Sequence, residues 1–211
     1  MKKLTLIISL IIFITNQGFS QIQAVTDKGD QVTLYEDGTW KYTNDSSETE
    51  EKEIPVSNIA YGKNEKSSFE VKSTKVNAGV YINTKDWTYK KNPIADAQEY
   101  TFQSRGKDIY AMMITEKVDI PIENLKKLAL SNAKDAAPDT KIVTEEYRMV
   151  NGKKIFFMQM NGSIEGMKFT YLGYYYSSEG GTIQFISYTT QNLLEEYKND
   201  MFELLNGFTI H

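Results

Sequence analysis

Apolar residues recur along this chain with two different periods, which predict strands in some segments and helices in others. Alternation of apolar and polar positions predicts strands near residues 69–71, 80–82, 99–102 and 109–115. Over residues 191–206 the apolar positions instead follow a period of 3.6, which predicts an amphipathic terminal helix. The stripe of that helix and the turn after it contains Leu193, Leu194, Tyr197, Met201, Leu204, Leu205 and Phe208.

Turn signals connect the later strands into hairpins. Asn151-Gly152 is the strongest short hairpin signal, and glycine turns at Gly166 and Gly180-Gly181 continue the pattern. The strands that these turns separate are predicted at 142–149, 154–162, 167–177 and 182–188. Pro121 predicts the start of a further helix over residues 122–136, before this group of strands.

The first twenty residues differ from the rest of the chain. Lys2 and Lys3 precede an apolar run over residues 4–14, and small residues lie just before Gln21. This order is typical of a secretory signal peptide. The run is too short to span a bilayer, which takes about 20 residues. We therefore predict that residues 1–20 are removed and that the protein is exported to the periplasm or beyond the cell, without an integral membrane segment.

Three zones follow the predicted signal peptide. Residues 21–42 contain short apolar pieces separated by glycine turns, which predict a three-stranded β-meander. Residues 43–58 are polar and acidic, as expected of a solvated linker. Residues 59–211 hold the long strands and both predicted helices, and they form the predicted main domain.

The order of elements in the main domain favours the α+β class. Strand 167–177 is apolar or aromatic on both faces, so both faces should be covered. With one helix before the hairpins and one after them, the prediction is an antiparallel sheet flanked by helices, that is, an α/β/α sandwich.

The pattern of the main domain resembles the PsbP/DcrB-like family. The resemblance covers about residues 69–210 and is carried by a strand ending in Val80-Tyr81-Ile82, a loop with Trp87, the helix after Pro121, the Asn151-Gly152 hairpin, a tyrosine-rich strand and the closing segment Phe208-Thr209-Ile210. It implies an α/β/α sandwich and an accessory, binding or assembly role. The N-terminal Asp37-Gly38-Thr39-Trp40 resembles a small β segment of exported bacterial proteins.

The inventory of reactive side chains is short. The chain has no cysteine, and its one histidine is His211, so thiolate chemistry and a Ser-His-Asp triad are excluded and no metal or cofactor is expected. The adjacent pairs Glu145-Glu146 and Glu195-Glu196 are expected on solvated faces, because neighbours on a strand or helix point in different directions. A formal net charge of −4 with no basic block gives no sign of a nucleic-acid partner.

Aromatic residues are the candidate binding residues. Tyr171, Tyr174 and Tyr176 are concentrated on one strand, and Trp87 lies in a predicted loop. Packing in the core is the simpler interpretation of the tyrosines, and a partly exposed aromatic surface is the alternative.

Together these observations favour an exported, non-enzymatic binding or accessory protein of the bacterial cell envelope. Its partner would be a protein or another envelope component. Two alternatives stay open: an envelope hydrolase that uses carboxylates alone, marked by two acids in one pocket, and a carrier of a small apolar ligand, marked by an apolar cavity under the terminal helix.

Overall fold

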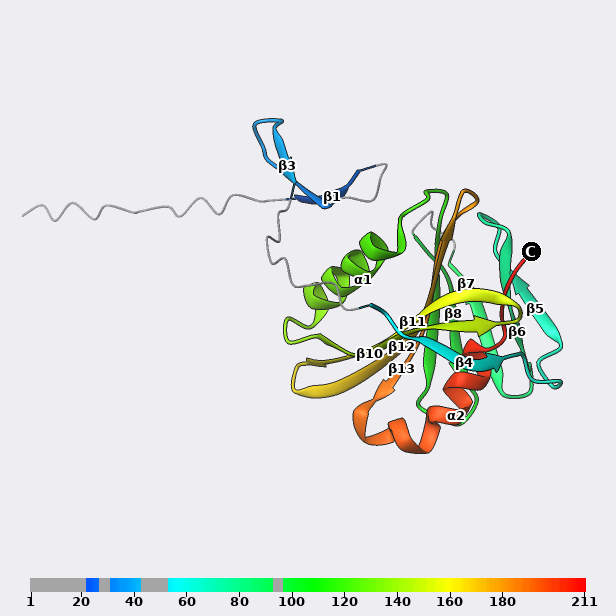
Figure 1. Ribbon diagram of the computed structural model, residues 1–211. Helices are drawn as coiled ribbons and strands as arrows, with labels where there is room; N and C mark the ends of the chain where they lie inside the picture. Colours follow the sequence, from blue (N-terminus) through cyan, green and yellow to red (C-terminus); the bar gives the residue numbers. More distant parts are fainter. Residues whose placement is uncertain (1–21, 27–30, 43–52, 93–96) are drawn as a thin grey trace, which may run out of the picture.

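The structure, a computed structural model, describes residues 22–26, 31–42, 53–92 and 97–211 (Figure 1). The predicted signal peptide and most of the predicted linker lie outside these residues. Within the described part of the chain, the strands form three sheets. None of the helices there is long and apolar enough to cross a membrane.

The first sheet is small and antiparallel. Its strands are β1 (Ile22–Val25), β2 (Gln31–Leu34) and β3 (Trp40–Tyr42), in that order. Gly38 makes the β2–β3 turn at a φ of +80°, a conformation that glycine adopts without strain. These are the strands that the glycine turns of residues 21–42 predict.

The second sheet has eight strands in the order β4-β10-β11-β12-β13-β9-β8-β7. Every neighbouring pair is antiparallel except β4 and β10, which are parallel. The strands are β4 (Val56–Tyr61), β7 (Trp87–Lys91), β8 (Gln98–Ser104), β9 (Tyr110–Glu116), β10 (Lys141–Val150), β11 (Lys153–Ile164), β12 (Met167–Ser178) and β13 (Gly181–Thr190). Strand β4 thus takes in the last residues of the segment predicted as a linker.

The third sheet joins segments that are far apart in the sequence. It has the order β14-β6-β5, with strands β5 (Phe69–Lys72), β6 (Ala78–Ile82) and β14 (Phe208–Ile210). Helix α1 (Ile122–Ala136) begins after Pro121, as predicted. A short 3₁₀ turn, η1 (Gln191–Leu193), precedes helix α2 (Leu194–Leu205).

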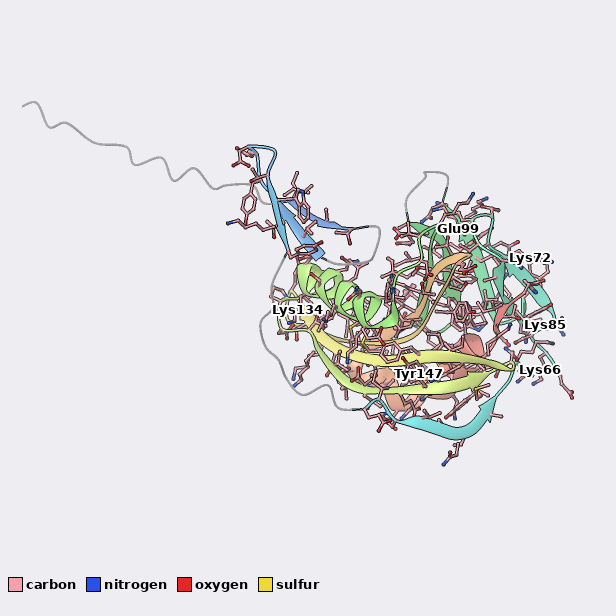
Figure 2. All side chains as sticks on the ribbon, turned by 45° about the horizontal axis from the view of Figure 1, so that its top comes forward. Lys66, Lys72, Lys85, Glu99, Lys134 and Tyr147 are labelled. Carbon is pink, nitrogen blue, oxygen red and sulfur yellow. The ribbon has the colours of Figure 1, made fainter. Side chains whose placement is uncertain are left out.

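The eight-stranded sheet separates two cores. On one face Leu125 and Ala129 of α1 pack on Phe156 and Tyr175. The other face packs against both α2 and the third sheet, and its core includes Leu204. Lys134, in the last turn of α1, projects to solvent on the side away from the third sheet (Figure 2).

The predicted fold class is wrong. Strands make up 53% of the described residues, and the large sheet is mixed, so the molecule is mostly β and is not a helix-flanked α/β/α sandwich. The reason is that each helix is short. At about 1.5 Å per residue, the 12 residues of α2 span about 18 Å, and the third sheet covers the remainder of that face.

Candidate functional site

The four aromatic residues predicted from the sequence do not form one site. Trp87 is the first residue of β7, only 5% exposed, and Tyr174 is wholly buried in the same core. Tyr176 is half-buried against that core, whereas Tyr171 is half-buried on the face that α1 covers. The split follows from the alternation of side chains along β12. Trp87 and Tyr174 therefore present no surface to a partner.

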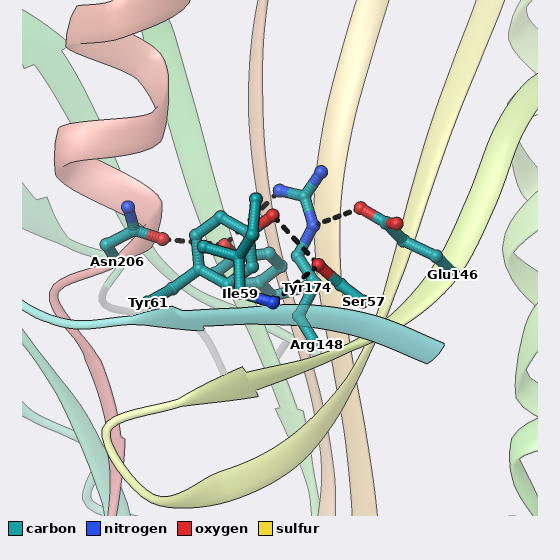
Figure 3. Close-up of polar contacts among 7 residues, drawn as sticks. All are labelled: Ser57, Ile59, Tyr61, Glu146, Arg148, Tyr174 and Asn206. Atoms are coloured by element: carbon teal, nitrogen blue, oxygen red, sulfur yellow. Dashed lines mark hydrogen bonds and ion pairs between the residues drawn. The ribbon is translucent and has the colours of Figure 1, made fainter. Parts of the chain in front are cut away.

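Tyr174 nevertheless belongs to a polar cluster, which has Arg148 at its centre (Figure 3). The Arg148 side chain lies on β10, is 9% exposed, and pairs with Glu146 at 2.7 Å between Nε and Oε1. Its guanidinium carbon lies 3.7 Å from the ring centroid of Phe157 and 4.8 Å from those of Tyr61 and Phe202. A buried guanidinium needs such a carboxylate and such aromatic faces to replace its lost hydration.

The Tyr174 hydroxyl connects this cluster to α2. It donates to Oδ1 of Asn206 at 2.7 Å, and Arg148 Nη1 lies 3.5 Å from it. Burial raises the pKa of Tyr174 to about 12, although Arg148 acts in the opposite direction. The hydroxyl therefore stays protonated at neutral pH and holds the Asn206 side chain in place.

Asn151 fixes the same region from the β10–β11 turn. Its φ of +47° lies in the left-handed region, where asparagine is tolerated. Its Nδ2 donates to the carbonyl oxygens of Asn206 and Phe208, and its Oδ1 accepts the Lys63 N–H. One turn residue thereby ties the β4–β5 loop to the end of α2.

A polar groove of about 370 Å³ lies between the segments that Asn151 joins. Its lining residues are Gly62, Asn64, Asn199, Phe202, Glu203 and Asn206. Three amides offer both donors and acceptors, Glu203 offers a carboxylate, and Phe202 offers an apolar ring. This set suits the recognition of a neutral ligand that is rich in hydroxyl or amide groups. It contains a single acid and therefore no pair of carboxylates for general acid–base chemistry.

One buried carboxylate, Glu99, lies outside the groove and is 3% exposed. It accepts hydrogen bonds from Ser73 Oγ at 2.6 Å, from Thr74 N and Oγ1 at 2.7 Å, and from Thr115 Oγ1 at 2.7 Å. Burial raises the pKa of Glu99, but these hydrogen bonds outweigh it and hold the pKa below its ordinary value. Glu99 is therefore an ionised anchor for the β5–β6 loop. Among the described residues, no group of three or more His, Cys, Asp or Glu side chains is arranged to hold a metal ion.

Comparison with known proteins gives a match in structure only. No family model matches the chain, and no curated protein matches it in sequence. The solution structure of cyanobacterial PsbP (CyanoP) from Synechocystis sp. PCC 6803 superposes with a TM-score of 0.50 at 14% identity, over 69% of this chain and 94% of that chain. The fold is PsbP-like. A protein of unknown function from Pseudomonas aeruginosa has a TM-score of 0.43 at 11% identity, over 68% of this chain and 96% of that chain.

The sequence analysis did not identify Arg148 or Asn206. It identified Asn151 as a turn residue but not as the side chain that hydrogen-bonds to the β4–β5 loop and to the end of α2. One local signal for Arg148 was present, because Glu146 and Arg148 are two residues apart on a predicted strand and so share a face. The partners of Asn151 carried no such signal, since Lys63 and Phe208 are 88 and 57 residues away.

Proposed function

We propose that this protein is an exported, non-enzymatic binding protein of the bacterial cell envelope, and that the groove between the β4–β5 loop and α2 is its ligand site. The observation that carries the proposal is a polar groove whose rims are held in place before any ligand binds. Asn151 fixes both rims, and Tyr174 orients the Asn206 amide. Preorganised polar groups lose little entropy on binding, so their hydrogen bonds contribute fully to affinity.

The ligand that fits this lining best is a carbohydrate segment of the envelope. Amide and carboxylate groups hydrogen-bond to sugar hydroxyls in both directions, and the Phe202 ring offers an apolar face to the C–H side of a sugar. Export, which rests on the character of residues 1–20, would bring the protein to such a ligand.

The two alternatives from the sequence gain less support. A carboxylate hydrolase needs two acids in one pocket, and Glu203 is the one acid in the groove lining. A carrier of apolar ligands needs a cavity under the terminal helix. There, Met201, Leu204 and Leu205 are at most 1% exposed and belong to one continuous core.

The test is a titration of the protein with soluble glycan fragments released from purified cell wall, followed by calorimetry. Glu203→Gln and Asn199→Ala should each weaken binding about tenfold, because each removes a hydrogen-bonding group from the lining. Glu195→Gln is the matched control, since Glu195 is exposed on the same helix outside the groove. Binding that is equal in all four proteins would contradict the assigned site. Turnover of the fragments would favour the hydrolase instead.

A further inference from the structure

One part of the molecule is basic, although the chain as a whole is acidic. Residues 66–92 contain six lysines and two acids, Glu70 and Asp86, which gives a net charge of +4. The formal net charge of the full chain is −4. Charge is therefore unevenly distributed along the chain, and residues 66–92 are positive although the net charge of the whole chain is negative.

The fold turns this segment into one surface by bringing the edges of two sheets together. Strand β5 ends the small third sheet and β7 ends the eight-stranded sheet. Their side chains meet: the rings of Phe69 and Tyr89 are 5.8 Å apart, and Lys91 Nζ donates to Thr74 Oγ1 at 3.2 Å. We call this line of contact, with the residues on either side of it (66–74 and 85–91), the β5–β7 seam.

Two aromatic rings are open to solvent on the seam. Phe69 is 44% exposed and Tyr89 is 43% exposed, while the neighbouring Tyr100 and Phe102 are buried beneath them. A half-exposed phenylalanine ring gains from an apolar environment outside the protein. Tyrosine is the type of residue that lies at the boundary between headgroups and acyl chains.

Exposed lysines flank the two rings in the sequence and belong to the same seam. Lys66, Lys72 and Lys85 project from the same side of the molecule, opposite to Lys134 (Figure 2). The Lys72 side chain is 68% exposed, and its contact with Glu70 is long, at 3.4 Å. Lys90 and Lys91 are also exposed and follow Tyr89 directly. The surface thus combines exposed positive charge with exposed aromatic rings.

We propose that the β5–β7 seam is the face with which this protein lies against an anionic lipid bilayer. The lysines would be attracted to the negative headgroups, and Phe69 and Tyr89 would enter the interface between the headgroups and the acyl chains. A soluble polyanion would pair with the lysines but would leave the Phe69 ring in water. The exposed rings therefore favour a lipid surface. The seam shares no residue with the groove lining, although the Lys66 N–H donates to Oδ1 of Asn64 there.

The experiment is co-sedimentation of the protein, as recovered from an exporting bacterial host, with vesicles of phosphatidylglycerol and phosphatidylcholine. The protein should bind these mixed vesicles more strongly than vesicles of pure phosphatidylcholine, and its binding to the mixed vesicles should weaken as salt is added. Replacing Lys66, Lys72 and Lys85 together by Gln should weaken binding about a hundredfold, because each lysine near an anionic surface adds to the attraction. Phe69→Ala should weaken it about tenfold, since the ring can no longer be buried in the interface.

Two matched controls separate the seam from general effects. A triple variant with Lys127, Lys134 and Lys141 replaced by Gln removes the same charge elsewhere, and Met167→Ala truncates another exposed apolar side chain. Both controls should bind as the unchanged protein does. The proposal fails if the two triple variants lose equal affinity, if anionic vesicles bind no better than neutral ones, or if soluble polyphosphate binds and vesicles do not.

Discussion

At the scale of single residues, buried charge determines the chemistry of this molecule. Arg148 and Glu99 both lie inside the protein, and the charge of each is stabilised in a different way. Arg148 has one carboxylate and several aromatic faces, whereas Glu99 has only hydrogen-bond donors. Both solutions satisfy the rule that a buried charge must be paired or fully hydrogen-bonded.

Replacing Arg148 by Ala should destabilise the fold by about 2–3 kcal/mol, because the change removes the contact with Phe157 and leaves Glu146 without its partner. Glu146 keeps some access to water, so the loss should stay near the lower limit for a broken buried pair. Urea denaturation measures it. Arg105→Ala, at an exposed arginine, is the control and should change stability by less than about 0.5 kcal/mol. Equal midpoints for the two variants would show that the cluster does not stabilise the fold.

Glu99 predicts a pH dependence of stability. Its pKa is lower in the folded protein than its ordinary value of 4.5, so its contribution is complete above that value. The contribution is lost as the pH falls through the lowered pKa, because protonation removes the negative charge that the four donors stabilise. Glu99→Gln should therefore be less stable at pH 7 by about 1–3 kcal/mol, and the difference in stability should narrow as the pH falls below the ordinary value of 4.5. Denaturation at several pH values tests this, with the exposed Glu179→Gln as control. A gap that is constant with pH would contradict it.

At the scale of elements, the end of α2 shows how a turn, a helix and a strand depend on one another. The sequence predicts one apolar stripe that includes Phe208, but the helix ends at Leu205 and Phe208 begins β14. Gly207 lies between them, and a Cβ there would collide with the carbonyl oxygen of Tyr81. The glycine is therefore required by the close approach of β6.

The apolar face of α2 should be essential for folding. Leu204 is 1% exposed and packs in the core beneath the eight-stranded sheet, so Leu204→Ala should cost about 2–5 kcal/mol. Thermal or urea denaturation provides the measurement. Glu196→Ala, on the exposed face of the same helix, should have a small effect. A denaturation midpoint for Leu204→Ala at the wild-type value would mean that this face is not core.

At the scale of the whole molecule, the described residues form a small N-terminal sheet and two further sheets that enclose two cores. Each core is continuous across several strands, so the part of the chain that encloses them should unfold as a unit. The small sheet has three strands, of which β3 is fully exposed, and therefore buries little surface of its own.

Limited proteolysis should cut first between residues 44 and 55, because a polar and acidic segment cannot bury enough surface to resist a protease. Mass spectrometry of the large fragment gives the position of the cut. The same measurement on uncut protein from an exporting host should give Gln21 as the first residue. A first cut within residues 142–188, or an intact Met1 on exported protein, would contradict the predicted organisation.

The sequence by itself determined the local features. Pro121 predicted the start of the helix over residues 122–136, which has those bounds in the structure, and Asn151-Gly152 predicted the hairpin between β10 and β11. These features depend on residues within a few positions of one another, and their geometry is set by backbone preferences. The resemblance to PsbP is supported at the level of fold. It rests on the order of helices, strands and hairpin turns, which can be predicted along the chain.

Only the tertiary structure decided which side chains are buried and which lie together. It placed Trp87 and Tyr174 in the core, paired β4 with β10 in parallel, and brought Asn151 to Lys63 across 88 residues of sequence. It also brought Phe69 and Tyr89 together from two different sheets and placed Lys66, Lys72 and Lys85 on one side of the molecule. Such contacts depend on the path of the whole chain and form only when distant segments pack cooperatively. No local pattern of residues encodes them.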